Sequence, residues 1–385
     1  MTSLGYQTFI DIYLPGLPRI AEFYNVNSSY VQLSMTLYLL GSGIAFFFYG
    51  LLSDIYGRKK LMLTGVLICS VGTIISLIST DINWFLFGRT LQGVGLGAAI
   101  LASPVLIDTL KGKTLVTAFV FYNIAYSAIP VLAPYFGGLI LKYYDWQVIF
   151  IVLLIYILII SLLIGFLLPE TLRKTENPSS FSTIFKDCSH ILSNKQFLWI
   201  TVVMTCSWGC IIVFNVLGPF LFQKIFLFTA YQYGVVTLAV GGVYMCSTFM
   251  NKFLLHYFEP ATLIFFSVFV ALICSTAFVL ITILGFDNMY VCLTVTLLLS
   301  FSCGLLFVNG ITLTLPIFPF NAGLAAALQG CISVLIWTAI TGIVAIFMYS
   351  QFFLSLFYFL LSISSFIILV ILSHKIRIIV PDHVN

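Results

Sequence analysis

The sequence predicts an all-α membrane protein with twelve transmembrane helices in two six-helix bundles. Of its 385 residues, 61% are apolar and only 7% are charged, and the mean hydropathy is +1.15. An ordinary soluble domain is about 25% charged, so this composition excludes one. Twelve spans of about 20 residues use about 240 residues, close to the apolar content. The long, continuously apolar runs exclude a β-barrel, whose strands alternate apolar and polar side chains.

The predicted spans lie between charged residues. The first span contains Asp11, and the start of the chain lacks the basic segment and cleavage site of a signal peptide. The long uncharged stretch 288–374 holds the last three spans, because Pro316 and Pro319 interrupt it once and residues 349–351 interrupt it again. The eight intervening spans are the uncharged stretches 23–53, 61–80, 90–107, 114–141, 146–169, 196–223, 225–251 and 260–286.

The basic residues predict that both termini are cytoplasmic. In that topology, twelve basic residues lie on the cytoplasmic side: Arg58, Lys59, Lys60, Lys111, Lys113, Arg173, Lys174, Lys186, Lys195, Lys252, Lys375 and Arg377. Only Arg19, Lys142 and Lys224 lie on the opposite side. An excess of Lys and Arg in cytoplasmic loops sets the orientation of most helical membrane proteins. The net charge of +4 is too small to indicate nucleic-acid binding.

The longest polar stretch divides the chain into two halves. We expect residues 1–168 to form an N-terminal six-helix bundle and residues 197–373 to form a C-terminal one. Residues 169–196 are the predicted central cytoplasmic linker, and residues 374–385 a cytoplasmic tail. Such internal symmetry is typical of transporters with a substrate site between the halves near the midplane.

The loop between the second and third spans carries a glycine-rich, charged motif. Gly50, Asp54, Gly57 and Arg58 occupy fixed positions of the pattern G-x-x-x-D-x-x-G-R-K. Glycine permits close packing and tight turns, and a carboxylate is stabilised at the positive end of a helix. The loop resembles the signature of the major facilitator superfamily, which implies that fold and transport by alternating access.

The resemblance implies a cytoplasmic latch. Asp54 would lie at the start of the eleventh span near residues 322–323, and Arg58 would pair with Asp108. The second-half counterpart, residues 251–258, keeps basic residues but lacks the acidic residue and the second glycine. We therefore expect the latch to be asymmetric.

The fourth and fifth spans carry two further motifs of the same superfamily. In span four, Arg89, Gln92 and the glycines at 93, 95 and 97 match R-x-x-Q-G-x-G. An arginine inside a span marks a functional site by default, although snorkelling to the interface is the alternative. The small-xxx-small spacing of Gly93 and Gly97 favours close helix packing.

In span five, Pro134, Gly137 and Gly138 belong to a motif close to the G-P-x-x-G-G pattern of antiporters, with Ala133 in place of the first glycine. The motif lies in the span where the superfamily has it. The resemblance therefore implies exchange of one solute against another.

The opening of the chain resembles one subfamily. Residues 11–18 read D-I-Y-L-P-G-L-P, similar to the D-x-Y-L-P-x-x-P opening of the bicyclomycin-resistance (Bcr/CflA-type) drug:proton antiporters. Further landmarks of that family recur at 169–172, Asn309 and 318–330. The resemblance covers nearly the whole chain.

The carboxyl group of Asp11 is predicted to lie deep in the membrane. It is about ten residues, or about 14 Å, from the cytoplasmic start of its helix, near the middle of an apolar core of about 30 Å. Burial disfavours a charged carboxylate, whereas a nearby cation favours it, and Arg89 lies at a similar level. The resemblance implies that Asp11 is the proton and substrate site and that Arg89 supports it. The alternative is a structural ion pair without a coupling role.

Few other polar groups are available inside the predicted bilayer. All four histidines fall in cytoplasmic segments, and Cys206 and Cys210 have no neighbouring histidine or carboxylate in the sequence, so we expect no metal and no cofactor. Candidates for lining the substrate cavity are Tyr13, Gln92, Trp208, Asn215, Asn309, Gln329 and Trp337. A largely apolar pocket with one carboxylate suits lipophilic or cationic compounds better than sugars or polyanions.

These observations favour a proton-coupled exporter of lipophilic or cationic small molecules. Its expected partners are the substrate, protons and the bilayer of a bacterial inner membrane; we expect a monomer without nucleic acid. An importer or uniporter of a metabolite or siderophore on the same fold is the alternative, since a fold does not fix the cargo. A membrane enzyme is disfavoured because the sequence lacks catalytic motifs, and a non-transporting receptor or scaffold because it carries the transporter motifs.

Overall fold

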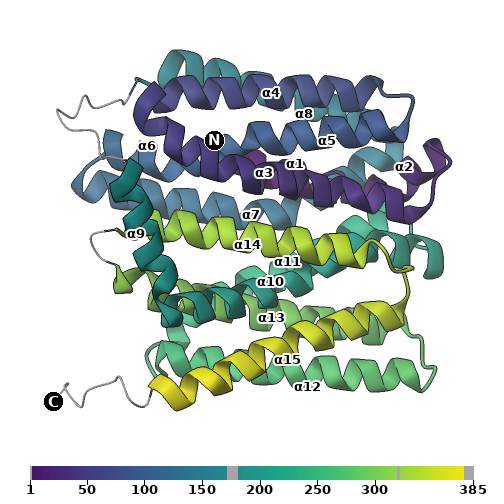
Figure 1. Cartoon of the computed structure of the whole chain (residues 1–385). Coiled ribbons are helices and arrows are strands. Elements are labelled where there is room, and N and C mark those ends of the chain that lie inside the picture. The colour runs from purple at the N-terminus through teal and green to yellow at the C-terminus, as the bar shows by residue number, and fades with distance from the viewer. Residues whose placement is uncertain (1, 171–180, 319–320, 377–385) are drawn as a thin grey trace. The chain divides into compact units, whose positions relative to one another are not determined.

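The computed structural model describes residues 2–170, 181–318 and 321–376, apart from a few side chains that include those of Asp54 and Ala322. All regular secondary structure in this part of the chain is helical, with no strand (Figure 1). In order, the elements are α1 Thr2–Asp11, η1 Leu14–Gly16, α2 Leu17–Phe23, α3 Ser28–Tyr56, α4 Arg58–Ile78, α5 Ile82–Leu96, η2 Gly97–Leu101, α6 Ala102–Thr109, α7 Gly112–Tyr143, α8 Trp146–Leu167, α9 Phe181–Ser193, α10 Lys195–Phe220, η3 Leu221–Ile225, α11 Ala230–Leu254, α12 Pro260–Ile283, α13 Met289–Thr314, η4 Leu315–Ile317, α14 Ala322–Val344 and α15 Gln351–Ile376.

The first predicted span differs from the others. Among the described residues, eleven helices are long and apolar enough to cross a membrane, and none of them includes residues 2–23. That segment consists of α1, η1 and α2 in succession. Pro15 has no N–H to donate and its ring crowds the preceding turn, so α1 ends at Asp11. Eleven of the twelve predicted spans therefore correspond to candidate membrane-spanning helices, three of which include a 3₁₀ or π-helical segment, and the first corresponds to a succession of short helices.

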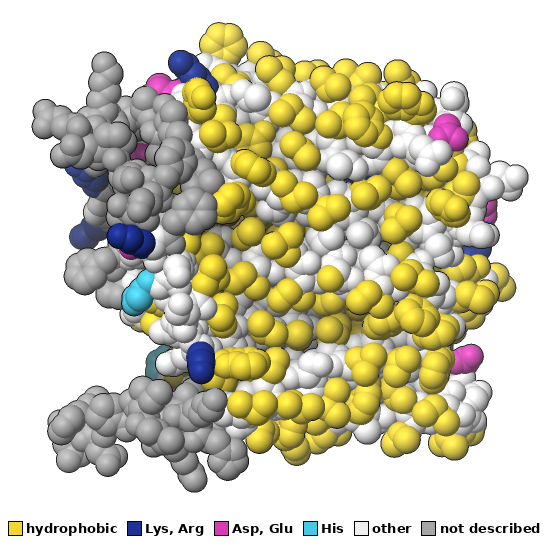
Figure 2. Space-filling model, in the orientation of Figure 1, with side chains coloured by type: hydrophobic (Ala, Val, Ile, Leu, Met, Phe, Trp, Pro, Cys, Tyr) yellow, Lys and Arg dark blue, Asp and Glu magenta, His cyan; other side chains and the backbone are white. Residues whose placement is uncertain are grey.

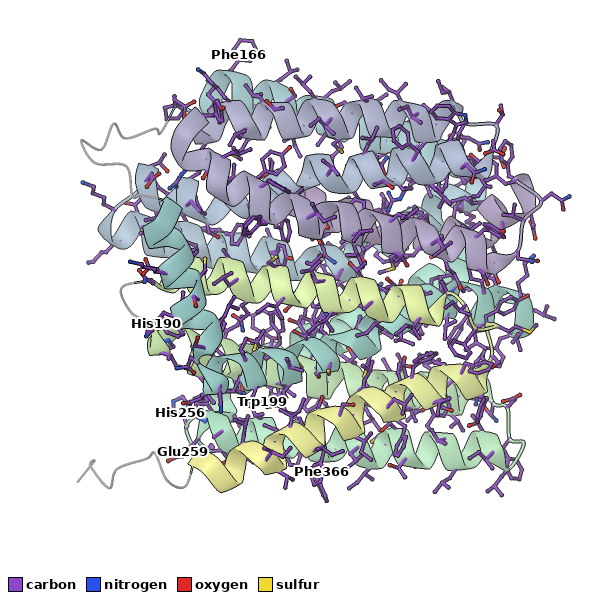
Figure 3. The ribbon with its side chains drawn as sticks, viewed as in Figure 1. Phe166, His190, Trp199, His256, Glu259 and Phe366 are labelled. Carbon is purple, nitrogen blue, oxygen red and sulfur yellow. The ribbon has the colours of Figure 1, made fainter. Side chains whose placement is uncertain are left out.

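Apolar side chains cover the outside of the helices. In Figure 2 they extend along the helices on the face shown, whereas Lys, Arg, Asp and Glu side chains gather towards the helix ends. Figure 3 shows Phe166 projecting outward from α8, where 85% of its surface is exposed. An apolar outer surface is stable in contact with lipid chains and would be unfavourable in water.

The chain folds into two compact units. The first contains Met1–Ser180, Asn215–Gly242 and Gly330–Ser350, and the second contains Phe181–Phe214, Val243–Gln329 and Gln351–Asn385. This division passes through α10, α11 and α14. The bundles expected from the sequence, 1–168 and 197–373, remain a prediction about the organisation of the domains.

Glycines bring the helices of the first unit close together. A Cβ at Gly93 would overlap with the backbone of Tyr38 on α3, and a Cβ at Gly97 would overlap with Ala45. On another side of α5, a Cβ at Gly88 would lie 2.6 Å from the carbonyl oxygen of Gly72 on α4. The predicted packing role of Gly93 and Gly97 is confirmed, and α5 is fixed between α3 and α4.

The second unit has its own polar connection between helices. The side chains of Asn251 on α11 and Asn309 on α13 are buried and face each other. Asn309 Nδ2 donates to Asn251 Oδ1 at 2.7 Å and to the Leu305 carbonyl at 2.8 Å. In an apolar environment, such a reciprocal amide contact links two helices firmly because neither amide has water as an alternative partner.

Candidate functional site

Asp11 lies at the last residue of α1 and is 1% exposed. Gln7 Nε2, one turn earlier on the same helix, donates to Asp11 Oδ2 at 2.7 Å. Asn215 Nδ2, from the part of α10 that belongs to the first unit, donates to Asp11 Oδ1 at 3.3 Å. Both carboxylate oxygens are therefore held by neutral amide donors.

Arg89 on α5 is completely buried, and its guanidinium lies between two tyrosine rings. Its Cζ is 4.0 Å from the ring centroid of Tyr13 and 4.8 Å from that of Tyr38. Nη1 donates to Gln92 Oε1 at 2.5 Å, and Nη2 donates to the Phe9 carbonyl at 3.1 Å. A guanidinium can stack on aromatic faces and donate in its own plane at the same time.

No carboxylate in the described chain forms an ion pair with Arg89; the two ion pairs found there join Arg58 with Asp108 and Lys224 with Glu22. The alternative expected from the sequence, a structural ion pair between Asp11 and Arg89, is therefore not present in the described structure. Instead, Arg89 holds the Phe9 carbonyl, two residues before Asp11. Arg89 therefore contacts the backbone at the end of α1 and not the carboxyl group of Asp11.

Further hydrogen bonds extend this polar group across the first unit. Gln92 Nε2 donates to Thr73 Oγ1 at 3.1 Å, which joins α5 to α4. The Tyr38 hydroxyl donates to the Tyr6 carbonyl at 2.8 Å, and the Tyr13 and Ser34 hydroxyls lie 3.1 Å apart. Tyr13 and Gln92, expected to line a substrate cavity, are thus buried partners of Arg89.

The second half of α10 contacts the opening segment at several levels. Pro219 is followed by a π-helical turn, Leu221–Ile225, which carries Gln223 and Lys224. Gln223 Nε2 donates to the Pro15 carbonyl at 2.9 Å, and Lys224 forms an ion pair with Glu22. π-turns frequently occur at functional sites. Together with Asn215, these residues connect α10 to α1, η1 and α2.

The predicted antiporter motif lies where α7 meets two neighbours. A Cβ at Gly137 would overlap with the carbonyl oxygen of Ile12, next to Asp11. A Cβ at Gly138 would lie 2.7 Å from the carbonyl oxygen of Ala230 on α11. Pro134 lies inside the same helix. Gly137 thus permits backbone contact beside Asp11, and Gly138 permits close contact between α7 and α11; a side chain at either position would prevent it.

The loop expected to form the latch contains the predicted charge pair. Arg58 Nη1 lies 2.6 Å from Asp108 Oδ2 at the end of α6. Gly57 has φ +91°, a conformation that favours glycine. A Cβ there would lie 2.7 Å from the carboxyl carbon of Glu170. The contact expected for Asp54 lies outside the described side chains.

Gly50 lies on an exposed part of α3. A Cβ at this position would meet no atom of the described side chains within 4 Å. The close packing expected at Gly50 stays a prediction.

The remaining cavity candidates have partners of their own. In the second unit, the Trp208 ring lies 5.1 Å from that of Tyr244, and Gln329 Nε2 donates to Thr314 Oγ1 at 3.4 Å. Asn309 pairs with Asn251, as described above. Trp337 is half-buried on α14 in the first unit. Asn215 is the second-half candidate for which the described structure gives a hydrogen bond to Asp11.

The described histidines lie near helix ends. Figure 3 shows His190 on α9 and His256 after α11, the latter close to Glu259. The side chain of His374 and the whole of His383 lie outside the described residues. Within the part of the chain that the structure describes, no three His, Cys, Asp or Glu side chains are grouped to hold a metal ion.

Some residues of the site are not evident from the sequence. Gln7 stands four residues before Asp11, a spacing that places both on one helix face, so the sequence does contain a signal for it. Tyr38, Thr73 and Lys224 reach the site from distant segments, and no local pattern indicates their partners.

Comparisons with known proteins agree with this architecture. Residues 1–337 match the Major Facilitator Superfamily. The multidrug resistance protein MdtL of Citrobacter koseri is 32% identical over 261 residues, which are 68% of this chain and 66% of that protein. The protein of the same name from Salmonella heidelberg is 31% identical over 265 residues, which are 69% of this chain and 67% of that protein. The chain thus matches about two thirds of the length of these relatives.

Two solved structures share the fold. A D-xylose-proton symporter has a TM-score of 0.73 and 14% identity, with 95% of both chains covered. The xylose transporter XylE from E. coli, partially occluded and inward open, has a TM-score of 0.72 and 14% identity, with 99% of this chain and 96% of that chain covered. At this identity the likeness concerns the fold alone.

The predicted family and fold are confirmed by these findings, which indicate a transporter rather than an enzyme. The apolar helices and the family together make the protein an integral membrane protein. With a match that spans most of its length, the chain belongs to the major facilitator superfamily.

Proposed function

We propose that this protein is a secondary active transporter that exports lipophilic or cationic small molecules in exchange for protons. The relatives named multidrug resistance proteins support this cargo class. The observation that carries the proposal is the environment of Asp11, a buried carboxyl group whose two oxygens accept hydrogen bonds from Gln7 and Asn215.

A carboxylate in a buried ion pair stays ionised, because its partner would otherwise be left as an uncompensated charge. Asp11 has neutral partners instead, and the nearest buried cation, Arg89, is engaged by Tyr13, Tyr38 and a backbone carbonyl. The carboxyl group is therefore free to be neutralised either by a proton or by a cationic substrate. Competition between these two ligands is the basis of exchange.

Asn215 provides a connection from Asp11 to conformational change. A ligand shifts a conformational equilibrium only if it interacts differently with the two states. Protonation or substrate binding changes how well the Asp11 carboxyl oxygen accepts the hydrogen bond from the Asn215 amide. Asn215 lies on α10, which leads into the turn that carries Gln223 and Lys224. We therefore propose that the state of Asp11 governs how α10 packs on the opening segment.

The proposal includes a topology. Both termini and the loop with Arg58 lie in the cytoplasm, and the Lys224–Glu22 pair lies on the opposite side of a bacterial inner membrane. The basic-residue distribution and the bacterial relatives support this placement. The Arg58–Asp108 pair, with Asp54, then acts as a cytoplasmic latch, and the protein works as a monomer.

An importer or uniporter on the same fold is the second candidate. Its support is that a sugar:proton symporter shares the architecture. Substrate and proton move in the same direction in a symporter. In the proposed exporter they compete for Asp11, and this difference is measurable.

Substrate-evoked proton release tests the proposal. Detergent-purified wild type in weak buffer with a pH dye is titrated with lipophilic cations, neutral antibiotics and siderophores. We expect acidification with lipophilic cations and none with Asp11→Asn. Asp81→Asn is the matched control, because Asp81 is an exposed helix cap and asparagine also caps helices. Binding without proton release in the wild type would refute exchange at Asp11, and so would unchanged release from Asp11→Asn.

A further inference from the structure

Gln32 on α3 is completely buried, and only one end of its amide has a partner. Its Nε2 donates to the Val216 carbonyl on α10 at 3.3 Å, whereas its Oε1 has no hydrogen-bond partner among the described residues. This orientation of the amide follows from the contact itself, because only the nitrogen can donate to a carbonyl oxygen. A buried acceptor without a donor is costly, so we expect this oxygen to meet a donor that the described chain does not supply.

A second unpartnered oxygen lies one helical turn further along α3. Thr36 stands four residues after Gln32, so the two side chains share one face of the helix. Thr36 Oγ1 is buried and likewise has no partner in the part of the chain that the structure describes. Its methyl group lies beside α14, where a Cβ at Gly342 would be 3.5 Å from it. Gln32, Thr36, Val216 and Gly342 all belong to the first unit, so both oxygens lie where α3 meets α10 and α14 within that unit.

The same turn of α10 carries the amide that holds Asp11. Asn215 directly precedes Val216, and its Nδ2 donates to Asp11 Oδ1 at 3.3 Å. Pro219 stands four residues after Asn215 and has no N–H. The Asn215 carbonyl therefore lacks the donor that a regular helix would supply. This turn thus connects the Gln32 amide with the Asp11 carboxylate and adds an acceptor of its own.

These groups share one chemistry, since all of them are oxygen acceptors near a carboxyl group. A carboxylate attracts every organic cation, but neutral carbonyl and hydroxyl oxygens favour only those cations that carry N–H or O–H groups. A protonated primary amine combines positive charge with three N–H donors, as the lysine ammonium group does. A quaternary ammonium ion has the same charge and no donor, so it would leave the neutral oxygens unpaired.

We propose that Gln32 is a specificity-determining residue of the Asp11 site and that its unpaired carbonyl oxygen selects protonated amines over quaternary ammonium ions. Thr36 supplies a second acceptor on the same face. The inference rests on the proposed export function and names the substrate class more narrowly. Asp11 provides the charge attraction that both kinds of cation share, and Gln32 provides the hydrogen bond that only the amine can form.

Two cations with the same charge and the same chain test this selection. The affinity of the purified full chain in lipid nanodiscs is measured by calorimetry for octylammonium and for octyltrimethylammonium, and empty nanodiscs correct for uptake by lipid. We expect the wild type to bind octylammonium more tightly. Gln32→Met keeps the size of the side chain but not the oxygen. It should weaken octylammonium binding roughly 10- to 100-fold and octyltrimethylammonium binding less than about threefold.

Two further variants separate recognition from packing. Gln32→Glu keeps an acceptor oxygen but, when ionised, cannot donate to the Val216 carbonyl. We expect it to retain the preference for octylammonium that Gln32→Met loses; a residue that only holds α10 in place would lose it in both variants. Gln147→Met is the matched control, because Gln147 at the start of α8 also has a buried Oε1 without a described partner. It should leave both affinities unchanged.

Equal binding of both cations to the wild type, loss of the preference in Gln32→Glu, or an equal effect of Gln147→Met would each overturn the proposal. So would an unchanged preference in Gln32→Met, the result expected if the two oxygens bind only buried water. Failure of the export function is distinguishable: the preference then still depends on Gln32, but octylammonium releases no protons in weak buffer. If only this inference is wrong, proton release persists and Gln32→Met binds both cations like the wild type.

Discussion

The replacement of Arg89 by lysine tests whether the buried guanidinium acts through its shape or through its charge. Lysine preserves the charge but offers a compact ammonium group without a planar face. In the structure the guanidinium lies between Tyr13 and Tyr38 while it donates to Gln92 and to the Phe9 carbonyl. One ammonium group cannot occupy all of these positions at once.

The expected cost follows from the interactions that lysine cannot make. Loss of one hydrogen bond to a charged group costs about 1.5–3 kcal/mol, and loss of one stacked aromatic interaction costs about 0.5–2 kcal/mol. We therefore expect Arg89→Lys to lower the free energy of unfolding by about 2–5 kcal/mol. The matched change Arg58→Lys affects a partly exposed ion pair, which should cost no more than about 1 kcal/mol.

Thermal unfolding in detergent, followed by dye labelling of newly exposed cysteines, measures both variants against the wild type. Arg89→Lys should have a clearly lower melting temperature, and Arg58→Lys should remain near the wild type. The reasoning is refuted if Arg89→Lys melts with the wild type, or if Arg58→Lys is the less stable of the two. A wild-type melting temperature for Arg89→Lys would show that positive charge alone accounts for Arg89.

Three further predictions concern packing and titration. Gly137→Ala should lower the melting temperature, because the new Cβ would overlap with a backbone carbonyl, whereas Gly50→Ala should leave the melting temperature unchanged or slightly raised. A lower melting temperature for Gly50→Ala than for Gly137→Ala would contradict the packing argument. Asn309→Ala should cost about 1–3 kcal/mol by leaving the amide of Asn251 unpaired, and the double Ala variant should cost less than the sum of both single variants, as measured in a double-mutant cycle. Partial burial, with a smaller contribution from a neighbouring carboxylate, raises the pKa of the Cys188 thiol, so less thiolate is present at a given pH. In a variant that keeps Cys188 as its single cysteine, alkylation at pH 8 should therefore be slower than alkylation of free cysteine. Equal rates would refute this prediction.

The family and most of the helices are predictable from the sequence, because long apolar runs have few alternatives to membrane spans. Asp11 is identifiable for the same reason, since a carboxyl group in such a run is costly and therefore conspicuous. The break in the first span is not among the predictions, although Pro15 and Pro18 stand in the segment. Both prolines belong to a family motif, and their effect on the helix is visible only in the structure.

The partners within the site are less predictable than the site itself. The depth of each residue in the membrane, counted along its helix, places Arg89 at the level of Asp11. The rotation of each helix about its axis, however, decides which side chains contact one another. Arg89 meets Tyr13 and Tyr38, and Asp11 meets Asn215 from α10. Pairings between distant segments depend on the packing of all the helices, which local spacing does not contain.

The most direct test of proton exchange at Asp11 is transport in proteoliposomes at zero membrane potential, clamped with valinomycin and equal potassium. With an acidic lumen, the wild type should accumulate a lipophilic cation inside the vesicles as protons leave, and nigericin should abolish the accumulation. Asp11→Asn should show no accumulation driven by the pH gradient. Accumulation driven by an alkaline lumen, equilibration that ignores the pH gradient, or wild-type activity of Asp11→Asn would each contradict proton-coupled export.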